Sequence, residues 1–384
     1  MNKTYLLPLL LAPLAAQASP RDIIIGIDEK AVWGAAGTPV IGAPGKDAVL
    51  VMDLTDPLQP KIRASLPLEN SVFGPPTNLQ ITPNGRLALV ANSVTNTEKD
   101  GKWTAAPTDK LYVIDLDATP PALVDTITVG RQPSGMAINA QGTLALVANR
   151  AGKSVSVLTI DGVTVKQVAE VPMVDEVAAI AITPDGKRAF AAKNLAGKVA
   201  VLSIDGTKVT TDKAQDVQVG AGVYNLDLTP DGKYLIAADT GVAGDGSSKT
   251  LSVVDAAATP PRRIDTVSIG DGPEGLAISP DGKWVMIPLL LGTTAPQTAW
   301  SYTKGGAAAL IAIEPGGKLR LVSTQPLGAI PEGVAWSPDS GAVYVGNYAD
   351  RDMQVFQVKN GTLVDSGARV KLPGQPASMR GLAR

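Results

Sequence analysis

The sequence predicts an all-β fold assembled from repeats, on the basis of a recurring hairpin, a set of regular strands and two complementary chain ends. A short apolar run, a Pro-Asp-Gly-type turn and a second apolar run recur at intervals of roughly 40 to 60 residues, as in repeat architectures. Each copy reads as a β-hairpin that cannot bury its apolar face alone. The copies lie at 81–92, 138–149, 182–193, 228–239, 276–287 and 336–347.

Each repeat divides into four strands, because turn residues separate short runs in which apolar side chains alternate. The hairpin supplies the first two strands, and a fourth strand leads into the loop before the next repeat. The third strand is the most regular of the four. The third strands lie at 49–54, 111–116, 155–160, 199–204, 251–256, 310–315 and 353–358.

The first repeat is split between the two ends of the chain. The run 23–28 matches the second strands of the other repeats, but no first strand precedes it. The segment 376–383 supplies that missing strand, and its pairing would remove the edge that an open ring exposes. We therefore expect a seven-bladed β-propeller of four-stranded antiparallel blades, closed by pairing of the C-terminal strand with the N-terminal blade.

The repeated turn is interpreted as structural, since proline sets its first corner and glycine accepts the positive φ that a tight hairpin needs. The strands after the turn end in Leu-Val-Ala-Asn at 89–92 and 146–149, and in Tyr-Val-Gly-Asn at 344–347. In these features the chain resembles the YVTN-type β-propeller repeat family. That resemblance implies the fold. Its wider group includes cell-surface proteins, periplasmic binding proteins, sugar lactonases and a protein that binds single-stranded DNA.

The N-terminal segment 1–18 has the features of a secretory signal peptide: Lys3, an apolar run and an Ala-x-Ala sequence ending at Ala18. The apolar run is short and broken by prolines, so it does not predict a membrane span. We expect export to the periplasm with cleavage after Ala18, no transmembrane segment after cleavage, and one propeller domain over 19–384. We also expect a monomer.

The composition excludes several chemistries. The chain has no cysteine and no histidine, so disulfides, Ser-His-Asp triads and imidazole-ligated haem or zinc are excluded. Covalent haem attachment through cysteine is excluded as well. The formal net charge of −2 disfavours nucleic acid as a partner, because a non-specific nucleic-acid binder needs a basic groove.

Long insertions interrupt the repeats between the second and third strands. In a four-stranded blade these loops lie on the same face as the loops that join one blade to the next. Long loops of this kind usually carry function. We call this face the insertion face and the opposite one the turn face. The insertions are 29–48, 93–110, 240–250 and 289–308.

Aromatic and polar residues on the insertion face are the candidates for ligand binding, since aromatic rings pack against sugars, bases or a protein partner. Polar groups from the loops between blades are expected at the mouth of the central channel. Asp175, Glu176 and Phe73 belong to the same loops. The ligand-binding candidates are Trp33, Trp103, Trp300, Tyr302, Tyr224, Tyr348, Arg131, Arg380, Asn225 and Asn78.

Two adjacent blades carry Pro-Glu-Gly at the same position, which predicts that Glu274 and Glu332 lie side by side near the axis. Paired carboxylates can act as acid and base or bind a hard cation, so both residues are catalytic and metal-binding candidates. The resemblance also implies calcium, because lactonases on related propellers use carboxylate and asparagine ligands. Asp28 and Asp239, at strand ends, complete the metal candidates.

Three functions remain open at this point. The first is a periplasmic protein that binds a small molecule or a protein partner on its aromatic insertion face, without catalysis. The alternative is a histidine-free, calcium-dependent sugar lactonase or a related hydrolase or lyase that uses the carboxylates at the channel mouth. The second alternative is single-stranded DNA binding through the tryptophans. Whether the protein is an enzyme is not decided by its sequence.

Overall fold

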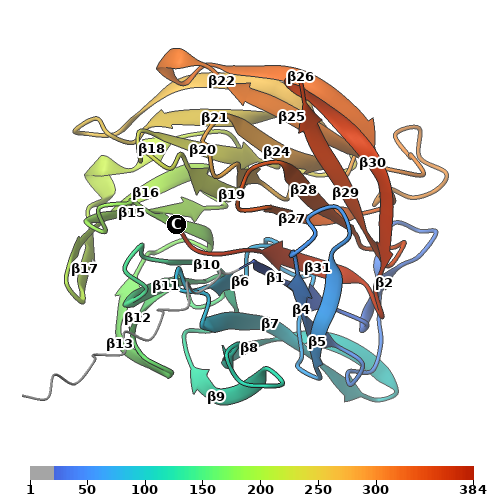
Figure 1. Cartoon of the computed structure of the whole chain (residues 1–384), viewed down its shortest axis with the longest axis horizontal. Coiled ribbons are helices and arrows are strands. Elements are labelled where there is room, and N and C mark those ends of the chain that lie inside the picture. Colours follow the sequence, from blue (N-terminus) through green and yellow to red (C-terminus); the bar gives the residue numbers. More distant parts are fainter. Residues whose placement is uncertain (1–20) are drawn as a thin grey trace, which may run out of the picture.

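The computed structural model describes residues 21–384, so the predicted signal segment 1–18 and its cleavage after Ala18 lie outside the described residues. Seven sheets surround a central axis, as predicted (Figure 1). Between residues 21 and 384, no helix combines the length and apolar character needed to span a membrane. The described chain is built almost wholly from strands and their connections.

Neighbouring strands within each blade pair antiparallel, and the innermost strand lies next to the channel. From the axis outward, the first three blades have the following strands. Blade 1 has β31 (Pro376–Arg380), β1 (Asp22–Ile27), β4 (Ala48–Asp53) and β5 (Lys61–Leu66). Blade 2 has β6 (Leu79–Ile81), β7 (Leu87–Lys99), β8 (Lys102–Asp115) and β9 (Ala122–Thr128). Blade 3 has β10 (Pro133–Ile138), β11 (Leu144–Asn149), β12 (Ser154–Asp161) and β13 (Thr164–Pro172).

The outer position of blade 4 is shared by two short strands on either side of a 3-10 helix, Lys213–Gln215. Blade 4 has β14 (Val177–Ile182), β15 (Arg188–Lys193), β16 (Lys198–Asp205), β17 (Lys208–Thr211) and β18 (Val217–Gln218). Blade 5 has β19 (Val223–Leu228), β20 (Tyr234–Asp239), β21 (Lys249–Asp255) and β22 (Arg262–Gly270). Blade 6 has β23 (Ala277–Ile278), β24 (Trp284–Leu289), β25 (Ala307–Ile313) and β26 (Leu319–Pro326), with a 3-10 helix at Pro315–Gly317. Blade 7 has β27 (Pro331–Trp336), β28 (Ala342–Asn347), β29 (Asp352–Lys359) and β30 (Thr362–Lys371).

The ring closes as the sequence predicts. β31 pairs antiparallel with β1, with Arg380 opposite Ile24 and Met379 opposite Ile25. The chain then continues onto blade 2, where the Ala383 backbone N–H donates to the Ile81 carbonyl at 2.7 Å. The C-terminal segment therefore completes blade 1 and also ties it to its neighbour.

The core consists of apolar layers between adjacent blades. The layer between blades 3 and 4, for example, contains Leu146 and Val157 on one side and Ile180 and Leu202 on the other. Second strands such as β11 are buried along their whole length, whereas the outer strand β9 is mostly exposed. Burial on both faces explains why second strands such as β11 read as continuous apolar runs.

The repeated turn is held by its own side chains. In blade 5 the Thr229 hydroxyl donates to the Asp231 carboxylate at 2.6 Å, and that carboxylate accepts the Lys233 backbone N–H at 3.1 Å. Gly232 follows with φ of 69°. The Thr229 hydroxyl and the Asp231 carboxylate are therefore used within the hairpin, as expected for a structural turn.

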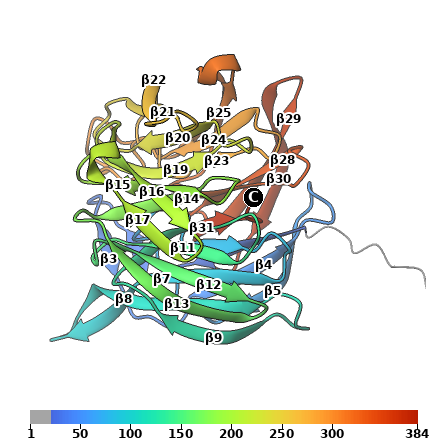
Figure 2. The same cartoon turned by 90° about the vertical axis from the view of Figure 1, so that its left-hand side faces the viewer.

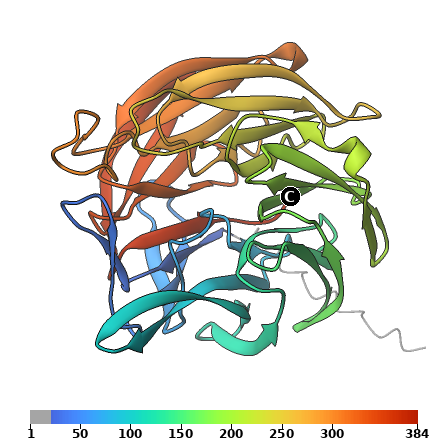
Figure 3. The ribbon, with the colours of Figure 1, turned by 180° about the vertical axis from the view of Figure 1, so that it is seen from behind.

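The insertions support one another on their face. Within 29–48 a small hairpin forms from β2 (Ala31–Trp33) and β3 (Pro39–Ile41). It contacts the loop 289–308, where the Gln297 backbone N–H donates to the Ala35 carbonyl at 2.9 Å (Figure 3). The β7–β8 hairpin extends beyond its blade (Figure 2).

We predict that Gly232→Ala destabilises the protein more than Gly162→Ala. Both glycines have positive φ, 69° and 59°, so alanine strains the backbone by on the order of 1 kcal/mol at either site. A Cβ at 232 would also lie 2.8 Å from Pro184 Cδ in the neighbouring turn, whereas no heavy atom lies within 4 Å at 162. Urea unfolding of the two variants measures the difference, and equal losses would contradict the close approach between turns.

Candidate functional site

A cavity of about 390 Å³ opens at the channel on the insertion face. Its walls come from the insertions and from the loops between blades, the two groups of segments that the sequence analysis assigned to this face. Aromatic, aliphatic and charged side chains all contribute. The lining residues are Trp33, Val72, Phe73, Val94, Ala105, Pro107, Gln132, Arg150, Tyr224, Glu274, Thr294 and Glu332.

The repeat places Glu274 and Glu332 at equivalent positions of adjacent blades. Each follows a proline that pairs with the end of the second strand, Pro273 with Leu289 and Pro331 with Asn347. Before each proline the chain turns at a residue with positive φ. Both glutamates line the same cavity, which agrees with their expected position near the axis.

Burial dominates the electrostatics of this carboxyl pair. Glu332 is only 3% exposed, and its Oε2 has no hydrogen-bond partner within residues 21–384. Burial, and then the charge of Glu274, raise the pKa of Glu332 well above its ordinary value. Burial also raises the pKa of Glu274 to about 7, against the opposing influence of Arg150. The pair therefore retains a proton at neutral pH, so it can donate as well as accept hydrogen bonds.

Arg150 is the cationic group of the cavity, and the sequence analysis missed it. It follows Asn149, the last residue of β11, so its backbone lies at a strand end on the insertion face. Its guanidinium lies 3.6 Å from the Glu176 carboxylate and 5.5 Å from the centre of the Tyr224 ring. Its buried Nε has no partner in the described chain. Its position directly after Asn149, which ends a second strand, could have placed it on the insertion face from the sequence.

Aromatic residues also line the cavity. The ring centre of Trp33 lies 6.4 Å from that of Phe73 and 5.9 Å from that of Tyr348, edge to face. Tyr348 is fully buried, and its hydroxyl donates to the Ala31 carbonyl at 2.7 Å. Tyr348 therefore anchors the β2–β3 hairpin under Trp33 and has no surface of its own to offer a ligand.

Three other aromatic candidates lie outside the cavity lining. Trp300 is 85% exposed and packs beside Gly246 of the preceding insertion, 240–250. Trp103 lies on the extended hairpin opposite Glu98, and Tyr302 is partly buried in the loop 289–308. We call these three residues, which lie on the insertions outside the cavity lining, the rim. The repeat pattern does not predict their positions, because these depend on contacts between insertions.

The polar candidates separate into different environments. Asn225 is buried, and its Nδ2 donates to the Glu274 carbonyl at 3.3 Å, so it bridges blades 5 and 6. Asn78 is also buried and donates to the Ala91 carbonyl at 2.7 Å. Arg131 is exposed, and Arg380 lies at the other end of the channel. None of the four lines this cavity.

The metal candidates do not gather into one site. Asp28 forms an ion pair with Lys30 at 3.3 Å, and Asp239 accepts hydrogen bonds from Thr250 and Ser252 at 2.8 and 2.7 Å. In the part of the chain that the structure describes, no three Asp or Glu side chains are grouped to hold a metal ion. Calcium takes six to eight oxygen ligands, so Glu274 and Glu332 form an incomplete donor set for it.

Comparison with solved structures supports the fold. The chain is 18% identical to the Pseudomonas aeruginosa periplasmic gluconolactonase PpgL, with a TM-score of 0.68 over 94% of this chain and 98% of that one. A candidate 6-phosphogluconolactonase from Bacteroides uniformis gives 18% identity and a TM-score of 0.65, over 94% and 99% of the chains. Kuenenia stuttgartiensis hydrazine synthase gives 18% identity and a TM-score of 0.62, over 81% of this chain and 90% of that one.

At these identities the likeness shows the fold alone. No protein-family model and no curated protein matches the sequence. The seven-bladed propeller, with lactonase-like structural neighbours, is therefore confirmed, whereas the YVTN-type resemblance is not confirmed by a family match.

We predict that the carboxyl pair makes the folded protein less stable as pH rises from 5 to 8. The pKa of Glu274 is raised from 4.5 to about 7, and that of Glu332 is raised as well, so in this range the folded state binds more protons than the unfolded state. Stability is then lost with rising pH, by on the order of 2 kcal/mol.

Urea unfolding at several pH values measures this loss. The double variant Glu274→Gln/Glu332→Gln should show a flatter pH dependence than the wild type and equal or greater stability at pH 8. Glu98→Gln, on the exposed β7–β8 hairpin, is the matched control and should follow the wild type. Parallel curves for the double variant and the wild type would show that the pair is not perturbed.

Proposed function

We propose that the protein binds a small, hydroxyl-rich ring compound of the sugar class in the insertion-face cavity. The observation that carries this proposal is the Glu274–Glu332 pair in one cavity with aromatic side chains. A carboxyl pair that retains a proton can both donate to and accept from hydroxyl groups. Flat aromatic surfaces pack against the C–H face of a ring. The cavity volume lies within the range of about 300–1,000 Å³ that is usual for ligand sites.

Export to the periplasm is part of this proposal. It rests on the signal-like segment 1–18, and the likeness to a periplasmic gluconolactonase is consistent with it. Single-stranded DNA is a poor fit to the cavity, because buried carboxyl groups repel phosphate. A protein partner would use the exposed rim around Trp300 in place of the cavity.

Hydrolysis of a sugar lactone is the second candidate function, favoured by the pKa of about 7 for Glu274 beside the guanidinium of Arg150. A general base works best when its pKa is near the operating pH. Ionised Glu274 would take a proton from water as the oxygen attacks the lactone carbonyl. Arg150 would stabilise the oxyanion, and protonated Glu332 would donate to the ring oxygen as the C–O bond breaks. The product is the open-chain hydroxy acid.

Ligand binding is tested by thermal unfolding and calorimetry with neutral sugars and aldonic acids as probes. A native-state ligand raises the unfolding temperature by mass action. We expect a rise for the wild type and at least ten-fold weaker binding for Trp33→Ala and Glu332→Gln. Trp300→Ala is the matched control, since Trp300 lies outside the lining, and should bind as the wild type does. Binding lost only in Trp300→Ala would move the site to the rim and overturn the proposal.

Hydrolysis is tested with glucono-1,5-lactone in a pH-stat at pH 6 to 7. If the second candidate is correct, Glu274→Gln lowers kcat about 100-fold or more, as expected for loss of a general base. Parallel reactions with EDTA and with added calcium test the predicted cation. If the protein binds sugars but the lactone hydrolyses no faster than it does spontaneously, the binding function stands and the lactonase function is contradicted.

A further inference from the structure

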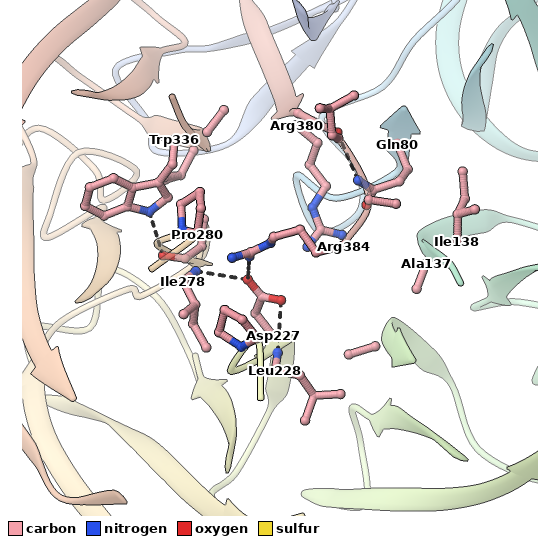
Figure 4. A pocket seen from close by; sticks show the side chains of 18 of the residues that line it. Gln80, Ala137, Ile138, Asp227, Leu228, Ile278, Pro280, Trp336, Arg380 and Arg384 are labelled. Carbon is pink, nitrogen blue, oxygen red and sulfur yellow. Dashed lines mark hydrogen bonds and ion pairs between the residues drawn. The ribbon is translucent and has the colours of Figure 1, made fainter. Parts of the chain in front are cut away.

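A second cavity, of about 310 Å³, lies at the other end of the channel, on the turn face. Its mouth is formed by the prolines of the repeated turns, among them Pro184, Pro230 and Pro280. Its walls are the last residues of the inner strands, which are largely aliphatic, as Ile138 and Ile278 illustrate (Figure 4). This cavity is separate from the insertion-face cavity, and no lining residue is common to both.

Two carboxylates, Asp22 and Asp227, line this cavity, and both have protein partners. Asp22 Oδ2 lies 2.6 Å from an Arg63 guanidinium nitrogen. Asp227 Oδ1 accepts the Leu228 backbone N–H at 2.9 Å. Its Oδ2 accepts the Ile278 backbone N–H at 2.9 Å and lies 3.2 Å from an Arg384 guanidinium nitrogen. Asp227 is thus fixed between blades 5 and 6, and its charge is compensated by Arg384.

Arg380 is different, because its guanidinium has few protein partners. In residues 21–384, the only hydrogen bond that its guanidinium donates goes to the Met136 carbonyl, at 3.3 Å. A guanidinium has five N–H donors, so most of its donors are left for another acceptor. Burial lowers the pKa of Arg380, with Asp227 acting in the opposite direction. An anion in the cavity would satisfy these donors and offset the cost of burying the charge.

The walls determine what kind of anion fits. Two uncharged polar side chains, Gln80 and Thr229, also line the cavity, and both donate to protein acceptors. The rest of the lining is apolar, and the Trp336 indole closes one side, with its Nε1 donating to the Ala277 carbonyl at 3.1 Å. A planar carboxylate matches the fork of a guanidinium, and an apolar body matches the aliphatic walls. A highly charged ligand such as a phosphate ester would leave charge unbalanced, since Arg384 is already paired with Asp227.

We propose that the turn-face cavity binds a small organic monocarboxylate with an apolar body, with its carboxylate on Arg380 and its body against the inner-strand residues. The prolines of the repeated turns then form the entrance to a binding site, in addition to their structural role. This site is independent of the function proposed for the insertion face.

Calorimetry with hexanoate and hexanamide tests the proposal on the full wild-type protein. The two probes share an apolar chain and differ in charge, so hexanoate should bind at least ten-fold more tightly because it alone forms a charged hydrogen-bonded pair with Arg380. Equal affinities, no binding of hexanoate, or tighter binding of butyl phosphate would each overturn it.

Variants then locate the site. Arg380→Met, whose folding is checked by its thermal midpoint, should weaken hexanoate binding at least ten-fold, and Arg380→Lys should retain part of the affinity. Arg320→Met is the control, since Arg320 is an exposed arginine paired with Glu314 on blade 6. Glu332→Gln changes the insertion-face cavity alone, so it should leave hexanoate binding unchanged. Loss of binding in Arg320→Met, or retention in Arg380→Met, would contradict the assignment.

Discussion

The pairing of β31 with β1 is the interaction on which the rest of the molecule depends. Without it, blade 1 would lack its inner strand, and β1 would present unpaired backbone groups at an open edge. The same segment contacts blade 2 through the hydrogen bond between Ala383 and Ile81. Because the core consists of layers between adjacent blades, closing the ring is what gives every blade two neighbours and buries both of its faces.

Closure also creates the channel and both of its cavities. Each inner strand has one end on the insertion face and the other on the turn face. β19 shows the consequence: Tyr224 at its start lines one cavity, and Asp227 near its end lines the other. Between them Asn225 is buried and bonded to the backbone of the next blade. One short strand therefore contributes a side chain to each cavity, and its middle residue forms a hydrogen bond between two blades.

Much of the fold could be predicted from the sequence because its signals are local. Turn residues and alternating apolar residues are repeated in every blade, so they predicted the strand order and the closure of the ring. They also predicted that Glu274 and Glu332 occupy equivalent positions. The insertions were harder, since contacts between distant segments set their side chains. Tyr348 was expected to bind and is buried by the β2–β3 hairpin, whereas Trp300 is left exposed. Arg380 was expected on the insertion face. It lies on the turn face instead, because β31 runs from Pro376 along the channel and Arg380 is its last residue.

Each cavity contains an ionisable group with few protein partners, Glu332 at one end of the channel and Arg380 at the other, and the scaffold explains how both are tolerated. Buried carboxyl groups and a partly buried guanidinium each cost stability when they lack a full set of partners. Glu332 and Arg380 are held on inner strands that are already fixed by backbone pairing and by the layers between blades. A rigid ring can therefore keep incompletely satisfied polar groups at both ends of its axis. Such groups are what a ligand satisfies when it binds.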